Sequence, residues 1–317
     1  MKHELKITAV LLGMFIATQL IGLFVIDAYS PKIITLSTGE NITGGNNIPY
    51  GMQPPSEMQT NISLATILIS LAIAVTLMLL LMKFKARIMI RTWFMLVIFI
   101  TLAVAINGIL LNLFPGSNIR FDTMALLIAM PLTFYKVFKR NLLIHNITEL
   151  FIYPGLAVMF IPILNITAVI ILLIVISIYD FIAVIKSKFM VQMAKYQIKT
   201  VGIFSGFFVP YLTAKSKSML EKLKVRNSSI NLRESRAAKK IPVSVAILGG
   251  GDIAFALIFA GVIMRNLGLI PALIVIACSS LCLLSLFFIG KKGKFYPAMP
   301  FVTAGCILGW LISKAII

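Results

Sequence analysis

The sequence contains few acidic residues, histidines and cysteines. Asp and Glu together number 10 among 317 residues, against 29 Lys and Arg, and charged residues amount to only 12% of the chain. Soluble domains carry about 25% charged residues, so the composition excludes an ordinary soluble protein. The two histidines, His3 and His145, stand near the ends of apolar segments, and Cys278, Cys282 and Cys306 stand inside such segments. We interpret the cysteines as packing residues and expect neither a metal site nor a cofactor.

Apolar residues dominate the chain instead. They make up 60% of it, and they recur in runs of about 18 residues or more, each long enough to cross a bilayer as a helix. The predicted spans are 5–26, 62–82, 92–113, 120–137, 147–164, 166–186, 242–264, 267–289 and 297–317. The expected fold class is therefore an all-α polytopic membrane protein with nine transmembrane helices.

The segments between these spans are alternately rich and poor in Lys and Arg. This alternation places 25 basic residues on one side of the membrane and 4 on the other. Because cytoplasmic loops carry the basic excess, we predict a cytoplasmic N-terminus and an external C-terminus. The net charge of +19 is explained by this topology, so we expect no nucleic-acid partner. The predicted location is the cell membrane, as a multi-pass protein in the lipid bilayer.

The charge pattern divides the chain into three parts. Residues 1–186 hold transmembrane helices 1–6, residues 187–241 form a basic cytoplasmic loop, and residues 242–317 hold transmembrane helices 7–9. An apolar patch, Thr200–Leu212, interrupts the basic loop. A tenth span there would reverse the orientation of every later loop, so we interpret the patch as an interfacial or amphipathic segment.

Two aspartates stand inside predicted spans. Most of the other acidic residues lie in loops or at span ends, such as Glu149, which we place near the first turn of the fifth span in a structural role. Asp180 lies roughly 9 Å and Asp252 roughly 16 Å along its span from the cytoplasmic end, at 1.5 Å per helical residue. Inserting an aspartate at the centre of a membrane helix costs about 2.5–3.5 kcal/mol of free energy. An aspartate at such a place therefore indicates a functional role. Both carboxyl groups are expected in the cytoplasmic half of the membrane, at depths close enough to meet.

Several roles suit a pair of neighbouring carboxyl groups. Two such groups cannot both ionise cheaply, so they share a proton. One can then take a proton from water while its protonated partner polarises a carbonyl, as in aspartic proteases. The same residues can instead relay charge in a transporter or a cation-leak channel, or hydrogen-bond to neighbouring helices in a non-catalytic scaffold. Composition alone leaves these alternatives open.

Three short motifs surround the two aspartates. Tyr179-Asp180 is a YD pair, Gly249-Gly250-Gly251-Asp252 fits GxGD, and Pro297-Ala298-Met299-Pro300 opens the last span from its cytoplasmic side. In this order and topology, the set resembles the presenilin and signal peptide peptidase family of GxGD intramembrane aspartyl proteases, most of all the archaeal presenilin homologues. The third motif of that family reads PAL or PALP, and this chain departs from it at Met299. A true PAL at Pro271-Ala272-Leu273 lies at the external end of its span, away from both aspartates.

The resemblance implies an aspartic endopeptidase that hydrolyses peptide bonds within the transmembrane helices of membrane-protein substrates. Asp180 and Asp252 would be its catalytic dyad and would activate a water molecule. Tyr179, Gly249, Gly250, Gly251, Pro297, Ala298, Met299 and Pro300 would bind the substrate. The glycines also suit close packing between helices. A substrate helix must unwind before it is cut, and pairing as an added strand would satisfy its freed backbone groups. A homo-oligomer is compatible with the sequence, which does not determine the oligomeric state.

Overall fold

The computed structural model describes residues 5–30, 32–35, 41–44, 48–52, 60–84, 86–115, 121–139, 141–186, 205–211, 244–290 and 296–316. The longer helices are α1 (Leu5–Tyr29), α2 (Thr60–Lys83), α3 (Arg87–Leu113), α4 (Phe121–Phe138), α5 (Leu142–Phe160), α6 (Ile166–Phe181), α9 (Gly250–Leu267), α10 (Leu269–Ile289) and α11 (Met299–Ile316). A 3₁₀ turn, η1 (Ile161–Ile163), follows α5, and a π-helical turn, η2 (Ile182–Lys186), follows α6. The strands are β1 (Lys32–Thr35), β2 (Asn41–Gly44), β3 (Gly206–Tyr211) and β4 (Ser244–Gly249).

These helices confirm the expected polytopic, mainly helical fold. Eight of them are long and apolar enough to cross a membrane, and α2 adds a further apolar stretch over Ala65–Leu81. Each predicted span overlaps one of these helices, because a long apolar run identifies a membrane helix more reliably than any local signal. The count of nine membrane crossings and the orientation of the termini stay predictions.

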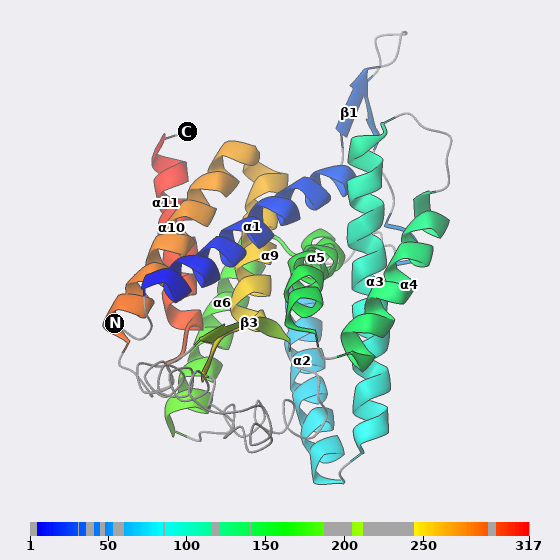
Figure 1. The fold of residues 1–317 in the computed structure, drawn as a ribbon. Helices are drawn as coiled ribbons and strands as arrows, with labels where there is room; N and C mark the ends of the chain where they lie inside the picture. The colour runs from blue at the N-terminus through cyan, green and yellow to red at the C-terminus, as the bar shows by residue number, and fades with distance from the viewer. Residues whose placement is uncertain are drawn as a thin grey trace, which may run out of the picture.

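The helices form two groups on either side of α5 (Figure 1). Helices α3 and α4 lie on one side of it, and α6, α9, α10 and α11 lie on the other, with α1 running obliquely across the bundle (Figure 1). Helices α10 and α11 approach each other closely, because a Cβ on Gly305 or on Gly309 would lie only 2.6 Å from the Cα of Ser279 or of Val275. Helices α6, α9 and α11 also pack on one another, and their ends build the candidate site.

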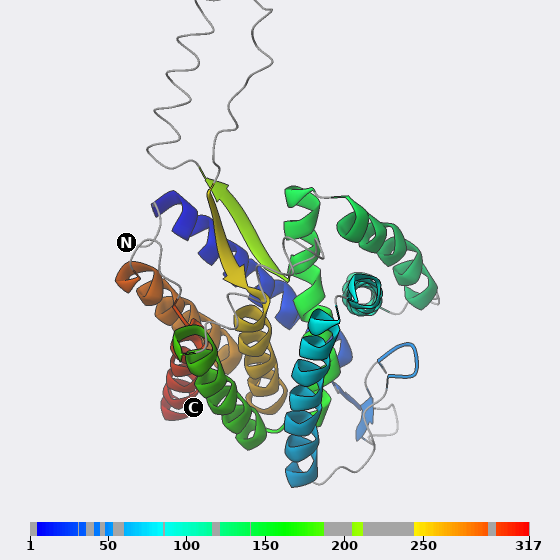
Figure 2. The same ribbon diagram turned by 90° about the horizontal axis from the view of Figure 1, so that it is seen from below.

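The strands β3 and β4 form an antiparallel ribbon beside the starts of α5 and α9 (Figure 2). Their register runs from Gly206↔Gly249 to Tyr211↔Ser244. Residues Gly206–Tyr211 of the predicted interfacial segment thus form a strand, and their place relative to the membrane stays a prediction. The rest of the predicted basic loop, 187–204 and 212–241, lies outside the described residues.

The predicted seventh span, 242–264, also starts in the wrong place. Residues 244–249 are strand β4, and the helix begins only at Gly250. Short apolar runs fit a buried strand as well as a helix, so hydropathy does not separate the two. Strand pairing satisfies the backbone groups on one edge of this run, while alternate side chains such as Ala246 and Leu248 are buried.

The start of α5 differs from the prediction as well. The helix begins at Leu142 rather than at 147, and the Asn141 side chain caps it by accepting a hydrogen bond from the amide of Leu143 at 2.9 Å. Glu149 therefore lies in the middle of α5 rather than in its first turn. Lys136, which falls inside the predicted fourth span, lies in the last turn of α4 and is buried. A buried salt bridge joins Lys136 to Glu149 and allows charge inside the apolar bundle.

Candidate active site

Asp180 lies one residue before the end of α6 and is only 4% exposed. Its Oδ2 accepts a hydrogen bond from the backbone N–H of Met299 at 3.2 Å. Met299 is the first residue of α11, so its amide has no partner within its own helix. A carboxylate at a helix N-terminus is favoured by the helix dipole. The structure therefore joins the YD motif directly to the backbone of the motif that opens the last helix.

The residues around Met299 explain why that amide is available. Pro297 and Pro300 carry no N–H, and the Ala298 carbonyl accepts hydrogen bonds from the amides of Phe301 and Val302, both at 3.1 Å. The proline pair thus starts the helix abruptly. In this segment the Met299 backbone supplies the donor, while its side chain is buried in the core, where methionine nearly conserves the volume of the leucine in the family motif.

Asp252 is the third residue of α9. The predicted position of Asp252, roughly 16 Å along its helix, is wrong, because strand β4 replaces the first part of that span. Its carboxylate lies against Gly249, where an added Cβ would be 3.0 Å from Oδ2. A negative charge in the first helical turn is again favoured by the helix dipole.

The three glycines before Asp252 have three different environments. Gly249 ends β4 in an extended conformation, with φ −66° and ψ 141°. Gly250 starts α9 in a crowded place, where a Cβ would lie 2.6 Å from both the Ser205 Oγ and the Tyr153 hydroxyl. A Cβ on Gly251 would meet nothing within 4 Å. The sequence left open whether the glycines are helical: the first is not, and the other two are.

Helices α6, α9 and α11 bring the motif-bearing ends to the same side of the bundle, where the β3–β4 ribbon also lies (Figures 1 and 2). One helical turn before Asp180, the Ser177 hydroxyl is 2.7 Å from the Thr303 hydroxyl and links α6 to α11. Tyr179, the other half of the YD pair, is 44% exposed. Its predicted contact with a substrate stays a prediction.

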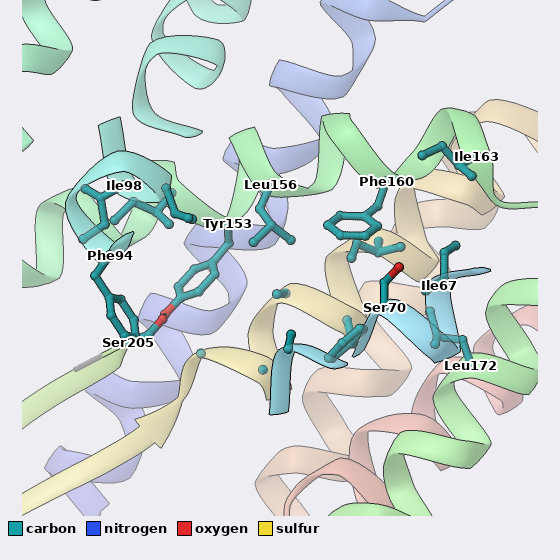
Figure 3. A pocket seen from close by; sticks show the side chains of 18 of the residues that line it. Ile67, Ser70, Phe94, Ile98, Tyr153, Leu156, Phe160, Ile163, Leu172 and Ser205 are labelled. Carbon is teal, nitrogen blue, oxygen red and sulfur yellow. The ribbon is translucent and has the colours of Figure 1, made fainter. Parts of the chain in front are cut away.

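An apolar cavity of about 680 Å³ reaches the start of α9 (Figure 3). Helices α2, α3, α5 and α9 supply most of its wall, with apolar side chains such as Phe94, Leu156 and Phe255. Its polar lining includes Ser205 and Tyr153, which lie near one another in Figure 3 with their hydroxyls 3.4 Å apart. Gly250 and Gly251 complete the wall at this end, so the cavity reaches the residue next to Asp252.

Sequence reasoning did not identify Tyr153 or Ser205 as site residues. Tyr153 belongs to an apolar run whose hydropathy says nothing about which face lines a cavity, and Ser205 precedes an unpredicted strand. Within the described part of the chain, no group of three or more His, Cys, Asp or Glu side chains is arranged to hold a metal ion.

The fold and the motif set are those of a membrane-embedded aspartyl protease. The chain belongs to the signal-peptide peptidase, presenilin aspartyl protease family, whose family model matches residues 45–317. The predicted membership is therefore confirmed, and with it the activity of an intramembrane-cleaving hydrolase in a multi-pass membrane protein.

Solved structures show the same fold. The chain is similar to a presenilin family intramembrane aspartate protease in a C222 crystal form, with a TM-score of 0.61, 18% identity and 98% and 99% of the two chains covered. A presenilin family intramembrane aspartate protease in a P2 crystal form gives a TM-score of 0.59, 20% identity and 97% coverage of each chain. The comparison with curated proteins gives no match.

Proposed function

We propose that Asp180 and Asp252 are the catalytic pair of this protease. The observation that carries the proposal is the packing of α6, α9 and α11, which brings the YD, GxGD and Pro297–Pro300 segments to one side of the bundle. There the Asp180 carboxylate accepts a hydrogen bond from the Met299 amide. In an aspartyl dyad, one carboxylate takes a proton from the attacking water while the protonated partner polarises the peptide carbonyl. The Met299 N–H holds the Asp180 carboxyl group in place during these proton transfers.

The apolar cavity is the proposed seat of the substrate helix. Its wall is nearly all apolar, as a transmembrane segment requires, and its end at Gly250 and Gly251 is beside Asp252. Because Gly251 has open space where a side chain would be, substrate backbone can approach closely there. Tyr179, Gly249 and residues 297–300 are the other proposed substrate-binding positions.

The β3–β4 ribbon indicates where unwound substrate would pair. In an antiparallel pair, the backbone groups of successive residues point alternately toward and away from the partner strand. The Gly250 amide donates to the Ser205 carbonyl at 3.3 Å, so odd-numbered residues of β3 and even-numbered residues of β4 face each other. Val245, Ile247 and Gly249 therefore direct their backbone groups to the outer edge of β4. A substrate strand on this edge would end beside Asp252.

Substitution of each aspartate tests the proposed dyad. Detergent-purified protein is incubated with a single-span membrane substrate, and cleavage products are quantified. We expect Asp180→Asn and Asp252→Asn each to abolish cleavage, because neither amide can exchange the required proton. Asp122→Asn is the matched control, since Asp122 is an exposed acidic residue at the start of another helix. Cleavage at the wild-type rate by either dyad variant would show that the assignment is wrong.

The alternative of a transporter or cation-leak channel has no support from the family or from the fold. Self-association stays a prediction. Size-exclusion chromatography with light scattering would reveal a homo-oligomer as a protein mass that is a multiple of 34.9 kDa.

A further inference from the structure

The first turns of α5 carry two side chains that bind the backbone of β3. The His145 Nε2 lies 2.8 Å from the carbonyl oxygen of Gly206. The Asn146 Nδ2 donates to the Phe208 carbonyl at 2.8 Å, and the Phe208 amide donates to the Asn146 Oδ1 at 3.0 Å. A side-chain amide offers one donor and one acceptor side by side. The Asn146 side chain therefore pairs with the backbone N–H and C=O of Phe208 as the backbone of a neighbouring strand would.

These contacts occupy the edge of β3 that faces away from β4. Gly206 and Phe208 are even-numbered, so their backbone groups point outward from the ribbon, toward α5. Pro210, the next outward residue, carries no N–H and suits an edge position. An open strand edge is a template for pairing with another chain. On β3, the outward backbone groups from Gly206 to Pro210 are bound by α5 or, at Pro210, lack an N–H. The outward backbone groups of β4 lie on the opposite edge of the ribbon, away from these contacts.

One of the two side chains that close this edge, His145, contacts a buried charged cluster. The Lys136 Nζ lies 2.6 Å from the Glu149 Oε1, 3.1 Å from the Thr148 hydroxyl and 3.5 Å from the His145 Nδ1. The Glu149 Oε1 is also 3.8 Å from the His145 Nε2. The His145 ring stacks at a tilt on the Phe208 ring, with centroids 5.0 Å apart. Polar contacts thus tie this end of α5 to β3 on one side and to the buried salt bridge on the other.

The support reaches the start of α9 through β3. Gly206 pairs with Gly249, and the preceding residue, Ser205, accepts the hydrogen bond from the Gly250 amide. Asp252 follows two residues later. Because a strand that slips by one residue turns every side chain to the other face, fixing β3 against α5 also fixes the register of β4 and the place of Asp252.

We propose that Asn146 is a positioning residue that closes the outer edge of β3, so that an unwound substrate segment adds to β4 alone and in one register relative to Asp252. The proposal rests on the proposed dyad and on strand addition by the substrate. Asn146 acts through β3 and does not touch the reacting atoms.

The test compares Asn146→Asp and Asn146→Leu with the wild type. Asn146→Asp has nearly the same shape, but it loses the donor and places an oxygen against the Phe208 carbonyl. Asn146→Leu removes both hydrogen bonds. We expect kcat to fall about tenfold, because part-buried backbone groups of Phe208 lose their partners, with a smaller change in KM. We also expect mass spectrometry to show cleavage spread over neighbouring peptide bonds, where the wild type cuts at a dominant one.

The matched control is Asn112→Leu. The Asn112 side chain also binds a backbone carbonyl, that of Phe24, at 2.6 Å, but it lies far from β3 in α3. It should keep the wild-type cleavage site. Variants of Asn146 that lose rate only in proportion to lost folded protein, with the wild-type cleavage site, would overturn the proposal. If the wild type cuts and the dyad variants do not, such a result contradicts only the role of Asn146. Cleavage by a dyad variant would instead contradict the proposed function.

Cross-linking gives a second measurement that does not depend on the rate. In a background with the native cysteines replaced by serine, Val245→Cys on β4 and Pro210→Cys on β3 are each combined with a single-cysteine substrate. Wild-type Asn146 should allow a disulfide with position 245 only, and Asn146→Leu should add one with position 210. Equal cross-linking at both positions in the presence of Asn146 would also overturn the proposal.

Discussion

The two aspartates reach the same side of the bundle in different structural settings. Asp180 ends a continuous apolar helix, is 4% exposed and is bound by a backbone amide of α11. Asp252 is partly exposed, follows a strand and lies in the first turn of α9. Helix packing therefore fixes the first carboxylate, and a ribbon held by α5 fixes the second. Substitutions that damage one support and spare the other can separate these two contributions.

The largest effect is expected from the buried salt bridge that supports the Asp252 side. Side chains of Lys136 and Glu149 are 2% and 1% exposed, so Lys136→Met leaves a buried carboxylate without its partner. Breaking such a pair costs about 3–5 kcal/mol, measured as the free energy of unfolding in mixed SDS micelles. The double variant Lys136→Met/Glu149→Leu should recover most of the loss. A double variant no more stable than the single one would contradict this assignment.

The next effect concerns the amide that holds Asp180. Proline is tolerated at the first position of a helix, so Met299→Pro removes the N–H while α11 can still begin there. A hydrogen bond to a charged group is worth about 1.5–3 kcal/mol, and we expect kcat to fall by roughly ten- to a hundredfold. Met299→Leu keeps the amide and nearly the same volume, so it should cleave at close to the wild-type rate. Equal rates for the two variants would mean that the amide does not matter.

Gly250 and Gly251 allow a comparison within the Asp252 side. A methyl group at Gly250 would collide with the hydroxyls of Ser205 and Tyr153, so Gly250→Ala should destabilise the protein by about 1–3 kcal/mol. Gly251→Ala meets open space and should leave the stability unchanged while slowing cleavage, because the methyl group enters the substrate path. Gly250→Ala should therefore lower the unfolding temperature more than Gly251→Ala does. Gly251→Ala should slow the cleavage by the folded protein more than Gly250→Ala does.

The smallest expected effect lies on the Asp180 side. Ser177→Ala removes the hydroxyl pair between α6 and α11, and the loss should be about 1 kcal/mol of unfolding free energy. Ser285→Ala serves as the control, since its hydroxyl binds only the Cys282 carbonyl of its own helix at 2.7 Å. If both variants unfold alike, the contact between helices adds nothing to the support of Asp180.

The helices and the motifs could be predicted from the sequence, but the connection between them could not. Long apolar runs and the pattern of basic residues identify membrane helices because lipid constrains them strongly. The ribbon has no such signal. The contacts of His145 and Asn146 with β3 span 61 and 62 residues along the chain, and nothing local announces them.

The same limit explains the errors at Glu149 and Asp252. A lone acidic residue in an apolar run looks like a helix end unless its buried partner is known, and Lys136 lies 13 residues away on another helix. Apolar residues before Asp252 fit a helix as well as a strand. An error in the predicted start of a helix therefore becomes an equal error in the predicted depth of an aspartate in that helix.

The most direct test of the catalytic pair is a double-mutant comparison of kcat/KM for the wild type, Asp180→Asn, Asp252→Asn and the double variant. Residues that act as one catalytic unit are strongly non-additive. We therefore expect each single variant to lose as much activity as the double variant. A double variant whose loss equals the product of the two single losses, or a single variant that keeps wild-type activity, would contradict the shared role of Asp180 and Asp252.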